Sequence, residues 1–267
     1  MASCIASNRT QSQPQRAAPI DLIRSLARAA VDLLLPIACI CCDRPVDVSD
    51  AGIVCGICWS RVRLLPSPRC DRCGHPVDRH SCRWCPLLPP YVRAARSYCW
   101  IGAGTGSEII HAFKYDGWQR SGKAIAARIG RLSWPVDVAF ERTATVAVPL
   151  ERIRERERGF NQSAVIASEL ALIWRIPQWN RVLERSRSTR SQTELTPEER
   201  KGNVAGAFRV RPGCADALAG AHIILVDDIV TTGATLQTCA KALFDAGART
   251  ISYATFGRAP AAGDRVL

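Results

Sequence analysis

The sequence predicts an α/β protein with a parallel sheet, preceded by a metal-bound segment. After residue 91, apolar runs alternate with stretches of helical period, which is typical of a parallel sheet covered by helices on both faces. Before it, eight of the 13 cysteines form four Cys-x-x-Cys pairs. A chain of 267 residues, 47% of them hydrophobic, can bury a core, which excludes disordered and fibrous proteins.

Charge and the lack of targeting signals narrow the class further. The net charge of +12 is carried mostly by arginine and favours phosphate-bearing partners, because guanidinium groups bind phosphate oxygens bidentately. No apolar run approaches the ~20 residues of a membrane span, and residues 1–20 lack the apolar core of a secretory signal. We therefore expect a cytoplasmic protein without a membrane span, whose cysteines bind metal rather than one another.

Hydrophobic periodicity places the elements in order. Residues 1–18 have no periodic pattern, whereas apolar spacings of three and four predict an amphipathic helix over residues 20–35, ending at Pro36. Further along, the patterns predict helices at 107–113, 122–132, 162–173 and 234–246, and strands at 145–148, 222–226 and 250–256. The continuous apolar run in 222–226 indicates a buried central strand.

The cysteine pairs are typical of zinc knuckles. Two thiolates separated by two residues lie on one tight turn, and two such turns complete a tetrahedral four-sulfur shell. Two structural zinc sites are therefore expected, with the ligands Cys39, Cys42, Cys55, Cys58, Cys70, Cys73, Cys82 and Cys85. The spacing is compatible with neighbouring or interleaved pairs, and an iron–sulfur cluster is the alternative metal group. Closed shells leave no position for a reactive water, so we expect the metal to fold residues 36–90 and not to catalyse.

The other cysteines fall outside this pattern. We expect packed thiols at Cys4, Cys41, Cys99, Cys214 and Cys239.

The segment 223–235 carries the strongest signal for a ligand site. An apolar strand ends in Asp227 and Asp228, and a hydroxyl-rich turn then opens a helix; this turn consists of Thr231, Thr232, Gly233, Ala234 and Thr235. Ligands of open parallel sheets bind at the carboxyl ends of strands, and unpaired amides at a helix start bind phosphate. The two acids would repel phosphate, so we expect them to face sugar hydroxyls or Mg²⁺ on the same ligand.

A ribose 5-phosphate with free 2- and 3-hydroxyls satisfies all of these demands. A Walker loop would need a Gly-Lys pair, and a dinucleotide fingerprint would need three spaced glycines; neither is present in this segment. The remaining alternative is that the acids are solvated and the turn only caps the helix.

Two arginine-rich segments supply cations. Residues 151–158 alternate Glu and Arg, an ordinary pattern for a solvated face, but residues 158–162 form a polar cluster in which Arg158 can approach an anion such as pyrophosphate. Within the polar stretch 184–203, residues 185–193 are interpreted either as a mobile basic loop that closes over a charged substrate or as a plain connection.

Together these motifs resemble the ComF family of competence proteins, in order, over residues 33–258. Beside the cysteine pairs, the matching segments are 113–117, 148–150, 158–162, Gln192 with Leu195, Arg200 with Asn203, and 227–235. The last of them is similar to the phosphoribosyl-pyrophosphate motif of type I phosphoribosyltransferases. The resemblance implies a flexible start and helix over 1–35, a double zinc ribbon over 36–90, a type I phosphoribosyltransferase-like parallel sheet over 91–260, and a tail over 261–267.

The resemblance also implies residue roles. It places Asp227 and Asp228 on the ribose hydroxyls and the turn from Thr231 to Thr235 on the 5-phosphate. Leu150, Glu151 and Arg152 would approach pyrophosphate accompanied by Mg²⁺, and Lys114 and Arg158 would assist catalysis by neutralising charge. The acceptor is not readable from the sequence.

Three functions stay open at this point. The first is a glycosyltransferase of the phosphoribosyltransferase type, linked by the resemblance to DNA uptake and natural transformation. The second is an accessory protein of the competence machinery that binds single-stranded DNA and keeps the ligand site as a sensor; Trp59, Trp84 and Trp100 are then either stacking platforms or core. The third is a zinc-dependent scaffold. Oligomeric state is open in all three.

Overall fold

The computed structural model describes residues 38–46, 54–77, 82, 84–115, 121–186 and 206–260. Its strands are β1 (Val92–Trp100), β2 (Arg142–Ala147), β3 (Leu183–Arg185), β4 (Phe208–Val210), β5 (His222–Val230) and β6 (Thr250–Arg258). Its helices are α2 (Gly56–Ser60), α3 (Thr105–Tyr115), α4 (Ser121–Gly130), α5 (Val136–Glu141), α6 (Arg152–Arg158), α7 (Gln162–Trp174), α9 (Ala215–Leu218) and α10 (Ala234–Asp245), with a 3₁₀ turn η1 (Cys85–Leu87).

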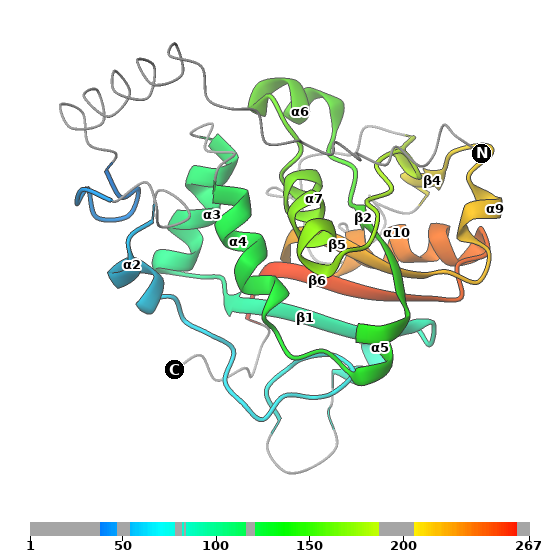
Figure 1. Cartoon of the computed structure of the whole chain (residues 1–267), viewed down its shortest axis with the longest axis horizontal. Helices are drawn as coiled ribbons and strands as arrows, with labels where there is room; N and C mark the ends of the chain where they lie inside the picture. Colours follow the sequence, from blue (N-terminus) through cyan, green and yellow to red (C-terminus); the bar gives the residue numbers. More distant parts are fainter. Residues whose placement is uncertain are drawn as a thin grey trace, which may run out of the picture.

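The main sheet is parallel, as predicted, with the strand order β1-β6-β5-β2 (Figure 1). Strand β5 is central, since Leu225 is in register with Val146 of β2 on one side and with Tyr253 of β6 on the other. Its apolar residues from Ile223 to Val226 are fully buried, which is why the run is continuous rather than alternating. The antiparallel pair β3-β4 forms a separate small sheet.

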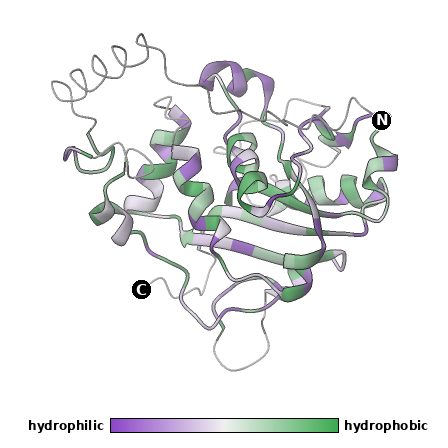
Figure 2. Cartoon of the chain, viewed as in Figure 1, coloured by the Kyte–Doolittle hydropathy of each residue, from purple (hydrophilic) through white to green (hydrophobic). Residues whose placement is uncertain are grey.

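Helices cover both faces of the main sheet (Figure 2). The two-residue period of β5 divides its side chains between two cores, one on each face. Ile223 and Leu225 belong to the core that includes Leu236 of α10. Ile224 and Val226 belong to the core of α3, α4 and α7, which includes Phe113. With both faces covered, the carboxyl ends of β2 and β5, which run parallel, open at the same edge of the sheet.

The predicted helices and strands among the described residues are present, with ends shifted by a few residues. Strand β5 runs on to Val230, so that both acids belong to the strand itself. Glu184 and Arg185, expected in a loop, pair with β4 as part of β3. The helix predicted over residues 20–35 lies outside the described residues, as do residues 187–193 of the predicted basic loop.

The edge strand β1 was not predicted from the sequence, nor were β4 and the short helices α2, α5 and α9. Strand β1 carries two arginines, which hid its apolar character. Arg96 is only 6% exposed, and its guanidinium donates hydrogen bonds to the carbonyls of Asp71 and Ser133 at 2.9 and 2.7 Å. Backbone acceptors far away in the sequence therefore satisfy a charge that a sequence pattern assigns to solvent.

Arginines also attach the second cysteine cluster to the sheet. Arg72 donates to four carbonyls, including Val92 of β1 at 3.2 Å and Pro89 at 2.8 Å. Arg258, at the end of β6, donates to the carbonyl of Cys73 at 2.9 Å. The metal-binding segment and the sheet are thus packed as one structure. In the described part of the chain, no helix has both the length and the apolar character that a membrane crossing needs.

Candidate functional site

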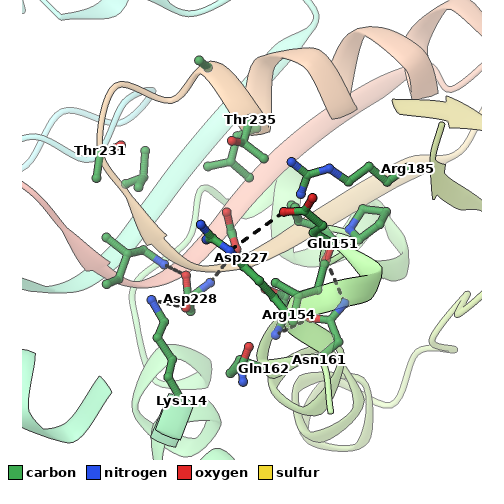
Figure 3. Close-up of a pocket in the computed structure, with 18 of the residues that line it drawn as sticks. Lys114, Glu151, Arg154, Asn161, Gln162, Arg185, Asp227, Asp228, Thr231 and Thr235 are labelled. Atoms are coloured by element: carbon green, nitrogen blue, oxygen red, sulfur yellow. Dashed lines mark hydrogen bonds and ion pairs between the residues drawn. The ribbon is translucent and has the colours of Figure 1, made fainter. Parts of the chain in front are cut away.

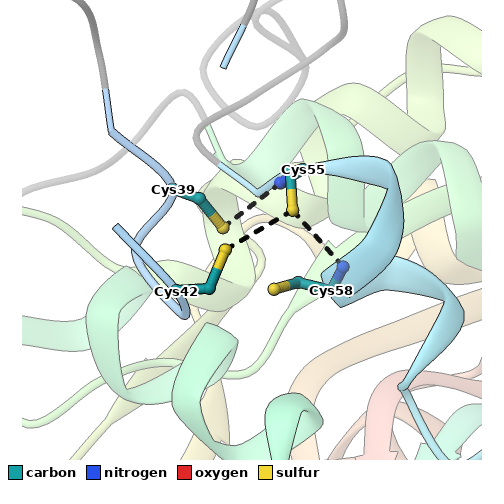
Figure 4. A group of neighbouring side chains, drawn as sticks. All are labelled: Cys39, Cys42, Cys55 and Cys58. Carbon is teal, nitrogen blue, oxygen red and sulfur yellow. Dashed lines mark hydrogen bonds between the residues drawn. The ribbon is translucent and has the colours of Figure 1, made fainter. Parts of the chain in front are cut away.

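The eight predicted cysteine ligands form two clusters, and each cluster joins neighbouring pairs. Cys39, Cys42, Cys55 and Cys58 make the first (Figure 4), and Cys70, Cys73, Cys82 and Cys85 the second; within each, the sulfur atoms lie within 4.8 Å of one another. The neighbouring arrangement is therefore the one the structure adopts, and the interleaved alternative is wrong.

The first cluster fits a tetrahedral four-thiolate zinc site. Zinc–sulfur bonds of about 2.3 Å place tetrahedral sulfurs about 3.8 Å apart, and the Cys42 and Cys55 sulfurs lie 3.7 Å apart. Backbone N–H groups also point at the sulfurs, such as Cys55 N–H to Cys39 Sγ at 3.3 Å. Burial by itself would raise the pKa of Cys39, but hydrogen bonds from the backbone of Cys55 and Cys41 and from the side chains of Cys42 and Cys58 together lower it to about 6. A bound zinc would cross-link the two turns and leave no open position.

The other cysteines in the described part of the chain are packed. Cys99 and Cys239 are buried thiols, and burial raises the pKa of Cys99 to about 12. Cys214 is buried as well, but it is disulfide-bonded, so the expectation of a packed thiol is wrong at this position. Cys41 is half-buried. Cys4 lies outside the described residues.

A cavity of about 360 Å³ opens where β5 and β2 end (Figure 3). Residues from several distant segments line it: the end of α3, the loop after β2, helix α6, the start of α7, strand β3, and the end of β5 with the loop that follows it. The predicted site residues among them are Lys114, Leu150, Glu151, Arg158, Asp227, Asp228, Thr231, Thr232, Gly233, Ala234 and Thr235. Arg152 is different: it lines a neighbouring cavity together with Glu155 and Arg211. The sequence predicted twelve residues that bind ligand or assist catalysis, and the fold brings eleven of them to this cavity.

The two adjacent carboxylates have different partners. Asp228 Oδ2 lies 2.7 Å from Lys114 Nζ, and both side chains are mostly buried. Asp227 Oδ1 accepts hydrogen bonds from the Ser163 hydroxyl and from the backbone N–H of Asp228, both at 2.9 Å. Asp228 is therefore neutralised by a cation, whereas Asp227 has only uncharged donors.

The pKa of Asp227 reflects this difference in partners. Burial raises its pKa from 3.8 to about 7, with a further contribution from the charge of Asp228, while Ser163 and Lys114 act in the opposite direction. The protonated form of this carboxyl therefore persists to higher pH than in an exposed aspartate. A ligand that offers hydroxyl donors or a divalent cation would favour its ionised form.

The phosphate loop, which we define as residues 230–233, leads into α10. Gly233 adopts a left-handed conformation with φ of +77° and is the N-cap of the helix, without a side-chain capping bond. The Ala234 N–H at this helix start donates to the Thr232 hydroxyl at 3.4 Å, and the threonine hydroxyls and the helix start line the cavity. This arrangement can bind a dianionic phosphate.

Cationic and amide side chains face the loop from α6 and α7. Arg158 donates to Gln162 Oε1 at 3.0 Å and to the Tyr115 hydroxyl at 3.1 Å, and its guanidinium lies over the Tyr115 ring. Gln162 is 2% exposed, and its Nε2 has no hydrogen-bond partner among the described residues. Arg154 and Arg185 also line the cavity. Helix α6 as a whole is exposed and hydrophilic (Figure 2), as the Glu/Arg alternation predicted.

Ser163, Tyr115 and Arg154 are among the lining residues for which the sequence predicted no role in the site. Ser163 directly follows the cluster 158–162, yet its contact with Asp227 depends on α7 packing beside β5. Asn161, already part of that cluster, caps α7 and donates through Nδ2 to the carbonyl of Val148 at 3.0 Å. It therefore holds the loop after β2 against the start of α7.

Comparison with known proteins matches two family models. Residues 30–87 match a double zinc ribbon domain, and residues 157–266 match a phosphoribosyl transferase domain. The DNA utilization protein YhgH of Salmonella typhi is 34% identical over 230 residues, covering 82% of this chain and 96% of that protein. Competence protein ComFC of Bacillus subtilis is 31% identical over 212 residues, covering 73% and 79%.

Solved structures give a much looser likeness. The hypoxanthine phosphoribosyl transferase of Trypanosoma cruzi is 20% identical, covers 58% of this chain and 70% of its own, and superposes with a TM-score of 0.31.

Proposed function

The chain belongs to the family of competence and DNA utilization proteins that join a double zinc ribbon to a phosphoribosyl transferase domain, and from this we propose that it binds phosphoribosyl pyrophosphate with Mg²⁺. The ligand would occupy the cavity at the end of β5. The names of the relatives, a DNA utilization protein and competence proteins, support a part in DNA uptake or utilization.

One observation carries this proposal: two carboxylates and a phosphate-binding helix start share one cavity. Asp227 and Asp228 end the buried strand, and the hydroxyl-rich turn from Thr231 to Thr235 opens α10 beside them. The amides and hydroxyls suit a 5-phosphate, and the carboxylates suit the 2- and 3-hydroxyls of ribose. A phosphate alone would leave the acids without a favourable contact.

Three arginines of the cavity suit the pyrophosphate. Arg154, Arg158 and Arg185 bring three guanidinium groups to the cavity, which can form bidentate hydrogen bonds with phosphate oxygens. The carboxylates among the described lining residues are Glu151, Asp227 and Asp228. They are the oxygen ligands that Mg²⁺ would find on the protein, and the ion would lower the negative charge of the pyrophosphate.

Transfer of the ribosyl group would break the bond from ribose C1 to the pyrophosphate oxygen and form a bond from C1 to an acceptor, which loses its proton. Positive charge develops on the ribose as pyrophosphate leaves. The arginines would stabilise the leaving group, and Asp227 and Asp228 the sugar, so that the chain's part is positioning and charge stabilisation.

Calorimetry tests the proposal with the zinc-loaded full chain, phosphoribosyl pyrophosphate and Mg²⁺. We expect wild type to bind and a double variant, Asp227→Asn with Asp228→Asn, to bind at least about tenfold more weakly, since two hydrogen bonds to charged groups are altered. The matched control is Asp245→Asn, which removes an acid of an exposed ion pair at the far end of α10. Undiminished binding by the double variant, or no binding by wild type, would contradict the proposal.

Single-stranded DNA is the second candidate partner, on the strength of the +12 charge and the DNA-related names of the relatives. The tryptophans support it less. Trp59 and Trp100 are 9% and 5% exposed, and Trp84 stacks on His75. Binding would therefore depend on arginine–phosphate contacts, and its affinity should fall steeply with salt. A flat salt dependence in a fluorescence-anisotropy titration would count against it.

A further inference from the structure

We propose that Glu151 makes the arginine-lined end of the cavity at β5 selective for magnesium pyrophosphate over the free pyrophosphate anion. This role rests on the proposed function and adds to it the form in which the ligand binds. Glu151 follows the end of β2 in the chain and directly precedes α6. It lines the cavity together with Arg154 and Arg185, two of the arginines proposed above to bind pyrophosphate.

Glu151 differs from the other acids of its segment because it is mostly buried. Its side chain is 14% exposed, whereas Glu155 and Glu157 of α6 are exposed. It occupies the N-cap position of α6, yet its side chain forms no capping hydrogen bond. Its Oε2 instead lies 3.9 Å from Arg154 Nε, and the carboxylate points into the cavity (Figure 3). The first acid of an otherwise solvated Glu/Arg alternation is thus turned toward the ligand site.

The Glu151 carboxylate also acts on Arg185, which belongs to β3. Burial lowers the pKa of the Arg185 guanidinium, and the charge of Glu151 acts in the opposite direction. One carboxylate therefore offsets charge on two guanidinium groups in the ligand-free protein. A metal-free pyrophosphate that approaches these arginines meets a fixed negative charge, in a site where partial burial weakens the screening by salt. Like charges brought together in this way reduce affinity.

The two aspartates of the cavity already have other partners. Asp228 Oδ2 lies 2.7 Å from Lys114 Nζ, and Asp227 accepts hydrogen bonds from the Ser163 hydroxyl and a backbone amide. Both are placed at the end of β5, where they suit the ribose hydroxyls. Glu151 is therefore the acid of this cavity that faces the arginines, and carboxylate oxygens are ligands that Mg²⁺ prefers.

The charge of the lining favours a ligand that brings its own cation. Among the described lining residues, four cationic side chains accompany three carboxylates, which leaves a formal charge of +1; these residues are Lys114, Arg154, Arg158, Arg185, Glu151, Asp227 and Asp228. Pyrophosphate carries more negative charge than this surplus can offset. Magnesium bound to it lowers that charge and presents a cation to Glu151. The same carboxylate therefore repels the free anion and attracts its magnesium complex.

Calorimetry of the zinc-loaded full chain with inorganic pyrophosphate, in the presence and absence of Mg²⁺, tests this role. The readout is the ratio of two dissociation constants, that of the free anion over that of the magnesium complex. We expect this ratio to exceed one in wild type and to fall about tenfold or more in Glu151→Gln, because a repulsion is lost for one ligand and a contact for the other. Magnesium is omitted rather than chelated, since a chelator would also remove zinc.

The matched control is Glu155→Gln, which removes the same charge at an exposed residue of α6 that does not line this cavity. It should leave the ratio as in wild type. Glu151→Asp keeps the charge and should retain most of the selectivity. Should Glu151→Gln disturb folding, as an unfolding temperature would reveal, Glu151→Ser removes the carboxylate with a residue that favours the N-cap position and should lower the ratio in the same way.

Three results would overturn the role of Glu151: a ratio of one or less in wild type, a ratio that Glu151→Gln and Glu155→Gln change equally, or no binding of pyrophosphate in either form. Phosphoribosyl pyrophosphate binding that persists beside any of these results would leave the proposed function standing. Conversely, a ratio that depends on Glu151, in a protein that does not bind phosphoribosyl pyrophosphate, would refute the proposed function alone.

Discussion

Replacing Asp227 by asparagine should stabilise the ligand-free protein while impairing the site. The carboxyl has a pKa of about 7 in the folded chain, against 3.8 when unperturbed, because it is buried beside Asp228. Asparagine keeps an oxygen that can accept from the Ser163 hydroxyl and the Asp228 amide. The change therefore removes an unfavourable ionisation and preserves the hydrogen bonds.

The sign follows from proton binding. Between about pH 4 and 7 the folded protein holds this proton and the unfolded chain has lost it, so this group makes wild type less stable as pH rises. A difference of about three pKa units, at about 1.4 kcal/mol each, sets an upper limit of about 4 kcal/mol. Solvent in the open cavity screens the charge, and we take about half of that value. The free energy of unfolding of Asp227→Asn should then exceed that of wild type by about 1 kcal/mol near pH 5.5 and by about 2 kcal/mol near pH 8.5.

Urea unfolding followed by tryptophan fluorescence at these two pH values measures the effect, with zinc bound throughout. Asp245→Asn serves as the control, because its exposed ion pair with Lys241 should contribute little, and equally, at both. A variant that is less stable than wild type near pH 8.5, or whose advantage does not change with pH, would refute the reasoning. A more stable protein that has lost phosphoribosyl pyrophosphate affinity would separate binding from folding.

The remaining predictions concern the cation, the loop and the metal. Lys114→Met should lower stability by about 1–3 kcal/mol in urea unfolding, because it leaves Asp228 mostly buried without its cation, and stability equal to wild type would contradict the pairing. Gly233→Ala should cost about 1 kcal/mol, since φ is +77° there and no neighbouring atom lies within 3.4 Å of a new Cβ; a rise in unfolding temperature would be the opposing result. Removal of zinc with a chelator should unfold residues 36–90 and leave the sheet, seen as a partial loss of protection in hydrogen exchange, and an unchanged exchange pattern would exclude a structural metal.

Local spacing explains why much of the site could be predicted. A Cys-x-x-Cys turn brings two sulfurs together whatever surrounds it, so the eight ligands were identifiable without a fold. In the same way, Asp227 and Asp228 follow the buried residues of β5, a few residues before α10 begins, and the end of a parallel strand and the start of a helix are each known to bind ligands. The apolar run of β5 identified the central strand because burial on both faces leaves no polar position.

Contacts between segments far apart in the sequence were decided by the tertiary structure alone. The choice between neighbouring and interleaved cysteine pairs, the ion pair of Lys114 with Asp228, and the hydrogen bond of Ser163 to Asp227 all depend on how α3, α7 and the cysteine turns pack. Strand β1 was missed because Arg96 is buried in it, where the guanidinium donates hydrogen bonds to backbone carbonyls far away in the sequence. Sequence spacing determines which groups are neighbours along the chain, whereas packing determines which of them meet across it.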